Sequence, residues 1–186
     1  LGRIIGYSVA NGVLPSTWKH SKVILLDKPN RDRKSVKSLR PISLCPSISK
    51  IAESYVRKDL RESMYSLSFA GRQHAYIEGK SSLEVVGSSV KWIASRRRWA
   101  ILSLDFSNAF GEIGHDSIMS SLEKLRVADR TRKWIHRWLS QRTAEVHYGS
   151  EVVTRECFPG KGTPQGALLS PWIFVLGTES IGEATE

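Results

Sequence analysis

Three short segments carry the side chains best suited to chemistry, and the first is an apolar run that ends at an aspartate. Ile101-Leu-Ser-Leu-Asp-Phe-Ser-Asn-Ala-Phe110 places Asp105 directly after alternating apolar residues. A carboxylate in such a position is costly to desolvate unless it has a partner. Mg²⁺ is one partner, because it is often shared between one or two carboxylates and substrate phosphates. An Asp that bonds to the backbone of the next turn is the alternative, and this segment alone does not decide between them.

The second segment is the turn Gly162-Thr-Pro-Gln-Gly-Ala-Leu-Leu-Ser-Pro171. Glycines at its first and fifth positions permit a positive φ or a close approach of backbone, and Pro164 stiffens the turn. The amide of Gln165 would then project from a rigid loop, where it could contact a base, a sugar or a phosphate. An ordinary loop that leads into a helix fits the same residues.

The third segment, Ser38-Leu-Arg-Pro-Ile-Ser-Leu44, places Arg40 in an otherwise apolar run. A guanidinium there needs an anionic or carbonyl partner, and its fork of donors matches phosphate oxygens. A structural ion pair, for instance with Glu53, would satisfy the same need. Arg40 is therefore a candidate for either role.

Apolar runs and periodic patterns predict the elements that must position these segments. Val23–Leu26 predicts a short buried strand before a basic loop over Asn30–Ser38, and Ala100–Phe106 predicts a second strand with alternating faces. The other predicted elements are helices over Ile48–Leu60, Ser81–Ser95, His115–Leu125, Asp129–Leu139 and Ala167–Gly177, and a β-hairpin of Glu145–Tyr148 and Glu151–Arg155 around Gly149-Ser150. Helices and strands alternate without a regular βαβ rhythm, so we expect a mixed α/β (α+β) fold rather than a Rossmann sheet.

The charge is strongly and unevenly positive. Lys and Arg total 28 against 18 Asp and Glu, a formal net charge of +10. Such an excess favours a polyanion partner, because neutralised phosphates release counterions, although a solvated basic surface fits the charge equally well. The two cysteines lack CxxC spacing, which argues against a zinc finger. We expect no membrane partner, because no apolar run approaches the ~20 residues that span a bilayer.

Taken together and in order, these segments resemble the reverse transcriptase domain of non-LTR (LINE-like) retrotransposons. The resemblance covers residues from about 14 to 176, nearly the whole chain. It is carried by Trp18-Lys19, Lys28-Pro29, Arg40-Pro-Ile-Ser-Leu44 with Lys50 and Glu53, Gln73, Leu104-Asp-Phe-Ser-Asn-Ala-Phe110, Gly162-Thr-Pro-Gln-Gly166 and Leu169-Ser-Pro171. Any single block would be a weak signal, but several blocks in family order make chance agreement improbable.

The resemblance implies a right-hand polymerase, of which this chain holds the fingers and part of the palm. Residues 1–80 would form the fingers and residues 81–114 the first part of the palm. Residues 115–161 would return to the fingers with the β-hairpin, and residues 162–186 would continue the palm. The implied activity is RNA-directed DNA synthesis, with an RNA template, a DNA primer and dNTP as partners and with the nucleus as its place of action.

The resemblance also assigns roles around the reacting phosphate. Asp105 matches the family's first catalytic carboxylate, which binds two Mg²⁺ ions, and the backbone carbonyl of Phe106 would contribute one more ligand. Arg40 matches the arginine that contacts the triphosphate, and Lys28 is a weaker candidate for a second phosphate contact. These roles agree with a phosphoryl-transfer transition state that needs positioning and charge neutralisation.

Further roles follow for the sugar and the base. Phe110 matches the aromatic residue that lies under the sugar and excludes a 2′-hydroxyl. Gln165 and Gly166 match the loop that braces the incoming nucleotide and the template base. An aromatic residue at the position of Phe110 argues against an RNA-synthesising polymerase.

Three departures from the family pattern affect what we expect of the chain. Gly111 follows Phe110 where the family usually has an Asp, and His74-Ala75-Tyr76 replaces a commoner Gly-Phe pattern. The family's second metal-binding strand, an aromatic residue followed by Ala-Asp-Asp, would lie beyond Pro171, and the sequence ends at Glu186 without it. We therefore expect a fragment that is inactive alone. A degenerate or repurposed element that only binds nucleic acid is the alternative.

Overall fold

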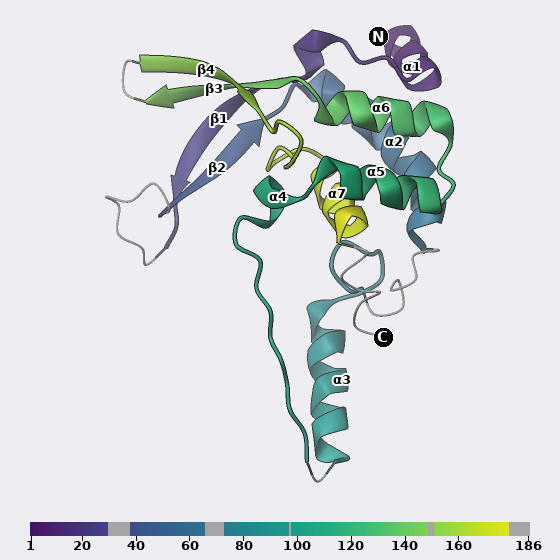
Figure 1. Cartoon of the computed structure of the whole chain (residues 1–186), viewed down its shortest axis with the longest axis vertical. Coiled ribbons are helices and arrows are strands. Elements are labelled where there is room, and N and C mark those ends of the chain that lie inside the picture. Colours follow the sequence, from purple (N-terminus) through teal and green to yellow (C-terminus); the bar gives the residue numbers. More distant parts are fainter. Residues whose placement is uncertain (30–37, 66–72, 97, 149–150, 179–186) are drawn as a thin grey trace.

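The helices and strands form a small sheet, a helical body and one projecting helix (Figure 1). A computed structural model of the chain describes residues 1–29, 38–65, 73–96, 98–148 and 151–178. Within these ranges there are seven α-helices, four strands and one 3₁₀ turn, η1 (Ser16–Trp18). None of the helices there has the length and apolar character needed to cross a lipid bilayer. The predicted mixed α/β class is confirmed for the described residues, whereas the division into fingers and palm stays a prediction.

The sheet joins strands from both halves of the sequence. β1 (His20–Asp27) pairs antiparallel with β2 (Leu39–Leu44) and parallel with β3 (Arg142–Tyr148). β3 in turn pairs antiparallel with β4 (Glu151–Cys157), which gives the order β2-β1-β3-β4. The parallel pair of β1 and β3 therefore connects the N-terminal segments to the second half of the chain.

Two of the strand predictions are confirmed by this sheet. Val23–Leu26 lies inside β1, and the predicted hairpin corresponds to β3 and β4. The turn Gly149-Ser150 lies outside the described residues, as does the predicted basic loop except for its last residue, Ser38. β2 coincides with the apolar run around Arg40.

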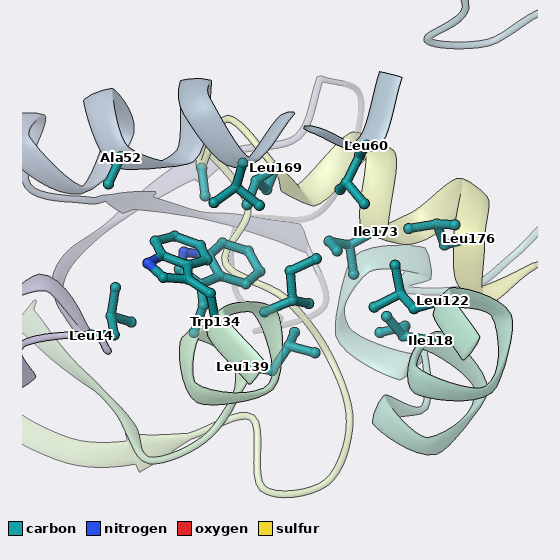
Figure 2. Packing of buried hydrophobic residues seen from close by; sticks show 14 of the residues in the cluster. Leu14, Ala52, Leu60, Ile118, Leu122, Trp134, Leu139, Leu169, Ile173 and Leu176 are labelled. Atoms are coloured by element: carbon teal, nitrogen blue, oxygen red, sulfur yellow. The ribbon is translucent and has the colours of Figure 1, made fainter. Parts of the chain in front are cut away.

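Five helices pack around one hydrophobic core. They are α1 (Gly2–Asn11), α2 (Ser47–Tyr65), α5 (His115–Lys124), α6 (Asp129–Leu139) and α7 (Ser170–Gly177). Trp134 and Trp138, one helical turn apart on α6, are both fully buried, and Figure 2 shows Trp134 among aliphatic side chains of the other helices. Burying each such side chain contributes roughly 1.5–3 kcal/mol, so this core holds the body together.

The predicted helices of the body are confirmed, with shifts at their ends. α6 has the predicted bounds, and α2 continues past Leu60. α7 begins at Ser170 rather than at Ala167, with Pro171 in its first turn as expected. The later start has a local cause, because the backbone N–H groups of Leu168 and Leu169 donate to a side chain of α2.

The predicted strand at Ala100–Phe106 is wrong. The segment is irregular and exposed, with Leu102 at 82% and Leu104 at 70% exposure, and it pairs with no strand among the described residues. Alternating apolar residues predict an extended backbone, but a strand also requires a neighbour that accepts its hydrogen bonds. The segment runs back along α3 (Ser82–Ala94), the predicted helix that projects from the body without a buried residue (Figure 1).

Candidate nucleotide-binding cleft

One cleft gathers most of the residues that the sequence predicts to bind the nucleotide. It has a volume of about 880 Å³ and lies where β1 ends, β2 begins and α4 (Ala109–Glu112) follows the exposed segment. Its walls are formed by Lys28, Leu39, Arg40, Pro41, Asp105, Phe106, Ser107, Asn108, Ala109, Phe110 and Gln165. Asp105 and Gln165 therefore share one cleft, as the predicted site requires. Gly166 is not part of the walls but adjoins Gln165 in the chain.

The antiparallel pair of β1 and β2 brings the two predicted phosphate ligands to one wall. Leu26 is opposite Arg40 in the register, and the backbone N–H of Lys28 donates to the carbonyl of Ser38 at 2.8 Å. Lys28 is half-buried and Arg40 is exposed. The wall thus bears two cations from neighbouring strands, an arrangement that suits an anionic ligand.

The alternative partner of Arg40, Glu53, is bonded elsewhere. Its carboxylate is fully buried on α2 and accepts hydrogen bonds from the Ser49 hydroxyl (2.9 Å) and the Trp138 indole (3.2 Å). It also accepts the backbone N–H groups of Leu168 (2.8 Å) and Leu169 (3.2 Å). No ion pair joins Arg40 to Glu53 in the part of the chain that the structure describes.

The sequence offered Glu53 only as a possible ion-pair partner of Arg40, and its burial and its hydrogen-bond partners come from the structure. Glu53 stands between Ala52 and Val56 on the buried face of α2, where an ionised group needs several donors. Three of its four donors come from α6 and from the loop that carries Gln165, more than eighty positions along the chain, and only the Ser49 hydroxyl is local to α2. Glu53 therefore anchors the loop that forms one wall of the cleft.

Asp105 is exposed in the cleft. The following turn contains Asn108 with a φ of 54°, and α4 begins without a side-chain capping bond. No hydrogen bond or ion pair engages the Asp105 carboxylate within the described residues, so Asp105 does not cap that turn. Among the described residues, Asp105 is the single carboxylate in the cleft walls, and no cluster of three or more His, Cys, Asp or Glu side chains there could hold a metal ion.

The two phenylalanines of the cleft rest on a third. The ring of Phe174 on α7 lies 5.4 Å from that of Phe110 and 6.0 Å from that of Phe106, centroid to centroid, the latter edge-to-face. Phe174 was missed by the sequence analysis because its apolar neighbours on α7 look alike. The Phe110 ring thus packs against α7, the helix that follows the Gln165 loop.

Backbone hydrogen bonds tie the Gln165 loop to both other segments. The Ser43 N–H of β2 donates to the carbonyl of Gln165 at 2.7 Å, and the Thr163 N–H donates to that of Phe110 at 2.7 Å. Gly166 has a φ of 122°, and a Cβ added there would lie 2.7 Å from the carbonyl oxygen of Ser43. The expected need for glycine is therefore confirmed at this position, since a side chain would push the loop away from β2.

The glycine that departs from the family pattern also has a local explanation. A Cβ added at Gly111 would lie 2.2 Å from the amide nitrogen of Asn108. The same Asn108 amide donates to Glu112 at 3.4 Å, and Glu112 accepts a 2.6 Å bond from Lys161, which lowers the pKa of the Glu112 carboxyl. Gly111 therefore accommodates the Asn108 side chain beneath the turn that carries Asp105.

Comparisons with known proteins agree with the resemblance. A family model described as reverse transcriptase (RNA-dependent DNA polymerase) matches residues 26–186. The chain is 28% identical over 167 residues to the Pol polyprotein of the retrotransposable element R2 of Popillia japonica, covering 88% of this chain and 23% of that protein. It is 26% identical over 172 residues to a probable RNA-directed DNA polymerase from transposon BS of Drosophila melanogaster, covering 90% and 19%.

A third relative, the RNA-directed DNA polymerase from the mobile element jockey of Drosophila melanogaster, is 25% identical over 173 residues, covering 88% of this chain and 18% of that protein. The chain thus spans about a fifth of the length of these relatives. The chain belongs to the reverse transcriptase (RNA-dependent DNA polymerase) family, and its relatives are polymerases of non-LTR retrotransposons.

Proposed function

We propose that this chain supplies the nucleotide-binding part of an enzyme that extends a DNA 3′ end on an RNA template. In this reaction the primer 3′-hydroxyl attacks the α-phosphate of a dNTP and pyrophosphate leaves. The observation that carries the proposal is the shared cleft, in which the carboxylate of Asp105, two cations, two aromatic rings and the amide of Gln165 converge from four separate segments. We also propose that the protein acts in the nucleus, as the family resemblance implies.

Each wall of the cleft has a part in this reaction. Arg40 and Lys28 bind the triphosphate, because both cations lie on the wall formed by β1 and β2. Phe110 lies under the sugar and is held there by Phe174, so a 2′-hydroxyl would meet a ring that cannot yield. Gln165 contacts the nucleotide or the template base from a loop that is fixed by backbone bonds.

Asp105 is the residue that would hold magnesium. Its exposed carboxylate, free of protein partners within the described residues, fits a Mg²⁺ ion that is otherwise bound by substrate phosphates. The carbonyl of Phe106 would add a second ligand. When bound, the ion neutralises charge on the phosphoryl oxygens.

We further propose that the chain does not catalyse the reaction alone. Two ions about 3.5–4 Å apart require more than one carboxylate. Among the described residues the cleft supplies Asp105 only. The same observation would fit a nucleic-acid-binding remnant, and the two possibilities differ in whether the rest of a polymerase restores activity.

Replacing Asp105 in an extended protein tests the proposal. The chain is joined to the remaining reverse transcriptase of one of its relatives, and Mg²⁺-dependent dNTP incorporation on an RNA template is measured. Asp105→Asn should lower incorporation by about 100-fold or more, because charge stabilisation by the ion amounts to several kcal/mol.

The control is Asp116→Asn, which removes an exposed aspartate on α5 outside the cleft and should leave the rate unchanged. Undiminished incorporation by the Asp105→Asn protein would show that the catalytic assignment is wrong. If the joined protein (the chimaera) folds with this chain unchanged but incorporates no dNTP, a remnant that only binds nucleic acid is the better interpretation.

A further inference from the structure

A second set of cations lies on α2, away from the nucleotide cleft. Arg57, Lys58 and Arg61 are exposed along the outer side of this helix. Together with Tyr76 and Trp172 they line a hollow of about 180 Å³, and these five residues are called the α2 patch below. The patch therefore combines three cations with two aromatic rings.

The cations of the α2 patch outweigh the carboxylate beside them. Glu78 also lines the hollow, but it is already paired with Arg61 at 2.6 Å. Arg57 lies over the ring of Trp172, with 5.1 Å between the guanidinium carbon and the ring centroid. This cation–π contact places the Arg57 guanidinium over the ring, and both Arg57 and Lys58 remain exposed to solvent.

The tyrosine of the patch is held in a conformation that its side chain disfavours. Tyr76 has a φ of 61°, which is uncommon for a bulky residue, and the residue is 49% exposed. Such a backbone conformation persists only where the surroundings impose it. In this conformation Tyr76 lines the hollow together with Arg57 and Trp172.

The patch and the cleft are connected through α2 and α7. Trp172 and Phe174 are two positions apart on α7, so their side chains point about 200° apart around the helix. Phe174 supports the rings of the cleft, whereas Trp172 packs against Arg57 of the patch. Glu53, one turn before Arg57 on α2, fixes the start of α7 through Leu168 and Leu169.

We propose that the α2 patch binds single-stranded RNA, and that this RNA is the unpaired part of the template. Cations bind phosphates, and exposed rings stack on bases, which only a single strand offers freely. An acidic peptide would use the charges but would leave the exposed ring of Tyr76 without a role. That the RNA is the template depends on the proposed polymerase function, whereas binding of a single strand does not.

The first experiment removes charge from the patch. Binding of a fluorescent uridine-rich RNA of about 12 nucleotides to the chain is measured by anisotropy. Arg57→Ala/Lys58→Ala should weaken binding by tenfold or more. The slope of the logarithm of the binding constant against the logarithm of the salt concentration should become less steep by about 1.4, for two lost phosphate contacts. The matched control is Lys91→Ala/Arg96→Ala, which removes the same charges from α3 and from the segment just after it, where Arg96 also lies over a tryptophan, Trp92.

Equal losses in the two double variants would overturn the proposal, because they would report net charge only. Glu78→Gln should raise the affinity for RNA rather than lower it, and a misfolded protein would not bind RNA more tightly. The substitution releases Arg61 from its pair and should tighten RNA binding by about twofold, within the range of an exposed ion pair. Unchanged or weaker binding by this variant would contradict the role of Arg61.

The second experiment tests stacking. Tyr76→Leu keeps the charge and should weaken RNA binding by about tenfold, as expected for one lost base–ring stack, while leaving inorganic polyphosphate binding unchanged. Parallel losses for RNA and polyphosphate, or no loss for either, would indicate a general polyanion surface and overturn the assignment. Tighter binding of single-stranded DNA or of duplex RNA than of the single-stranded RNA would overturn the template assignment.

The failure of this inference is distinguishable from failure of the proposed function. Asp105→Asn should bind the RNA as tightly as the parent chain, because Asp105 is outside the α2 patch. If Asp105→Asn left incorporation intact while the Arg57/Lys58 variant lost RNA binding, the polymerase assignment would fail and the RNA site would stand. If instead Asp105→Asn abolished incorporation while the Arg57/Lys58 variant kept its RNA binding, the polymerase assignment would stand and the RNA site would fail.

Discussion

At the scale of single residues, the cleft depends on side chains that are fixed by a neighbour rather than by their own segment. Phe110 belongs to a one-turn helix, α4, which is too short to fix an aromatic ring. Its ring is instead held by Phe174, 5.4 Å away on α7. Asp105, by contrast, has no such support within the described residues and is left open to a ligand.

Removing the ring at position 110 should therefore relax sugar selection. In the chimaera, Phe110→Ala should lower the ratio of kcat/KM for dNTP over the ribonucleotide by more than about tenfold, or about 1.4 kcal/mol. The reason is that a 2′-hydroxyl would no longer meet a supported ring. Incorporation of each nucleotide is followed on the same RNA template.

The comparison variant is Phe174→Leu, which keeps the Phe110 ring but removes its support. It should give a smaller loss of the same kind. If sugar preference is unchanged in the Phe110→Ala protein, the residue does not contact the sugar.

At the scale of elements, a buried carboxylate connects α2, α6 and the loop before α7. Glu53 accepts four hydrogen bonds, two of them from backbone N–H groups that would otherwise be unpaired at the start of α7. A buried charge is tolerated when it is satisfied in this way. The loop that carries Gln165 is therefore held by α2 as well as by β2.

Neutralising this carboxylate should loosen the connection. Glu53→Gln replaces one acceptor oxygen by an NH₂ group that faces donors, which should lower the free energy of unfolding by about 2–3 kcal/mol. Urea unfolding of the chain measures the loss. Hydrogen exchange should also accelerate at the backbone amides of Leu168 and Leu169.

The control for this change is Glu123→Gln on α5, where the side chain is 78% exposed and pairs with Arg132 at 3.4 Å. An exposed pair of this kind contributes little to stability, so the free energy of unfolding should change by less than about 0.5 kcal/mol. Similar effects of the two substitutions would mean that Glu53 does not organise the loop.

At the scale of the whole molecule, the cleft forms where distant parts of the chain meet. The bond from Ser43 to Gln165 joins β2 to the loop before α7, and the pair of β1 and β3 joins the two halves of the sheet. The projecting α3 and its exposed return segment lead directly into the turn of Asp105 (Figure 1). The sheet and the Gln165 loop thus position Lys28, Arg40 and Gln165, and the return segment brings the Asp105 carboxylate to them.

Separating β2 from the loop should disrupt the cleft. Gly166→Ala places a Cβ against the Ser43 carbonyl at a φ of 122°, and should lower Tm and weaken dNTP binding. Gly160→Ala is the matched control, because that position also has a positive φ, 72°, but has nothing within 4 Å of an added Cβ. Equal losses of stability in the two variants would show that backbone strain, and not the contact with β2, requires glycine at 166.

The sequence by itself determined the features that depend on neighbouring residues. The periodicity of α6 predicted its bounds, the run at Val23–Leu26 predicted a strand, and the segments around Asp105, Arg40 and Gln165 carried the family resemblance that implied a shared site. These features depend on local spacing, which is present in any window of ten to twenty residues. Side-chain chemistry, likewise, is independent of the fold.

Only the tertiary structure decided which segments meet. Alternation at Ala100–Phe106 predicted a strand, yet the described residues offer it no neighbour, so it stays irregular. Glu53 was a possible partner of Arg40 in the sequence, yet besides the nearby Ser49 its donors come from Trp138 and from the loop before α7. The physical reason is that hydrogen bonds and packing between segments about a hundred residues apart depend on the whole topology, which no local pattern contains.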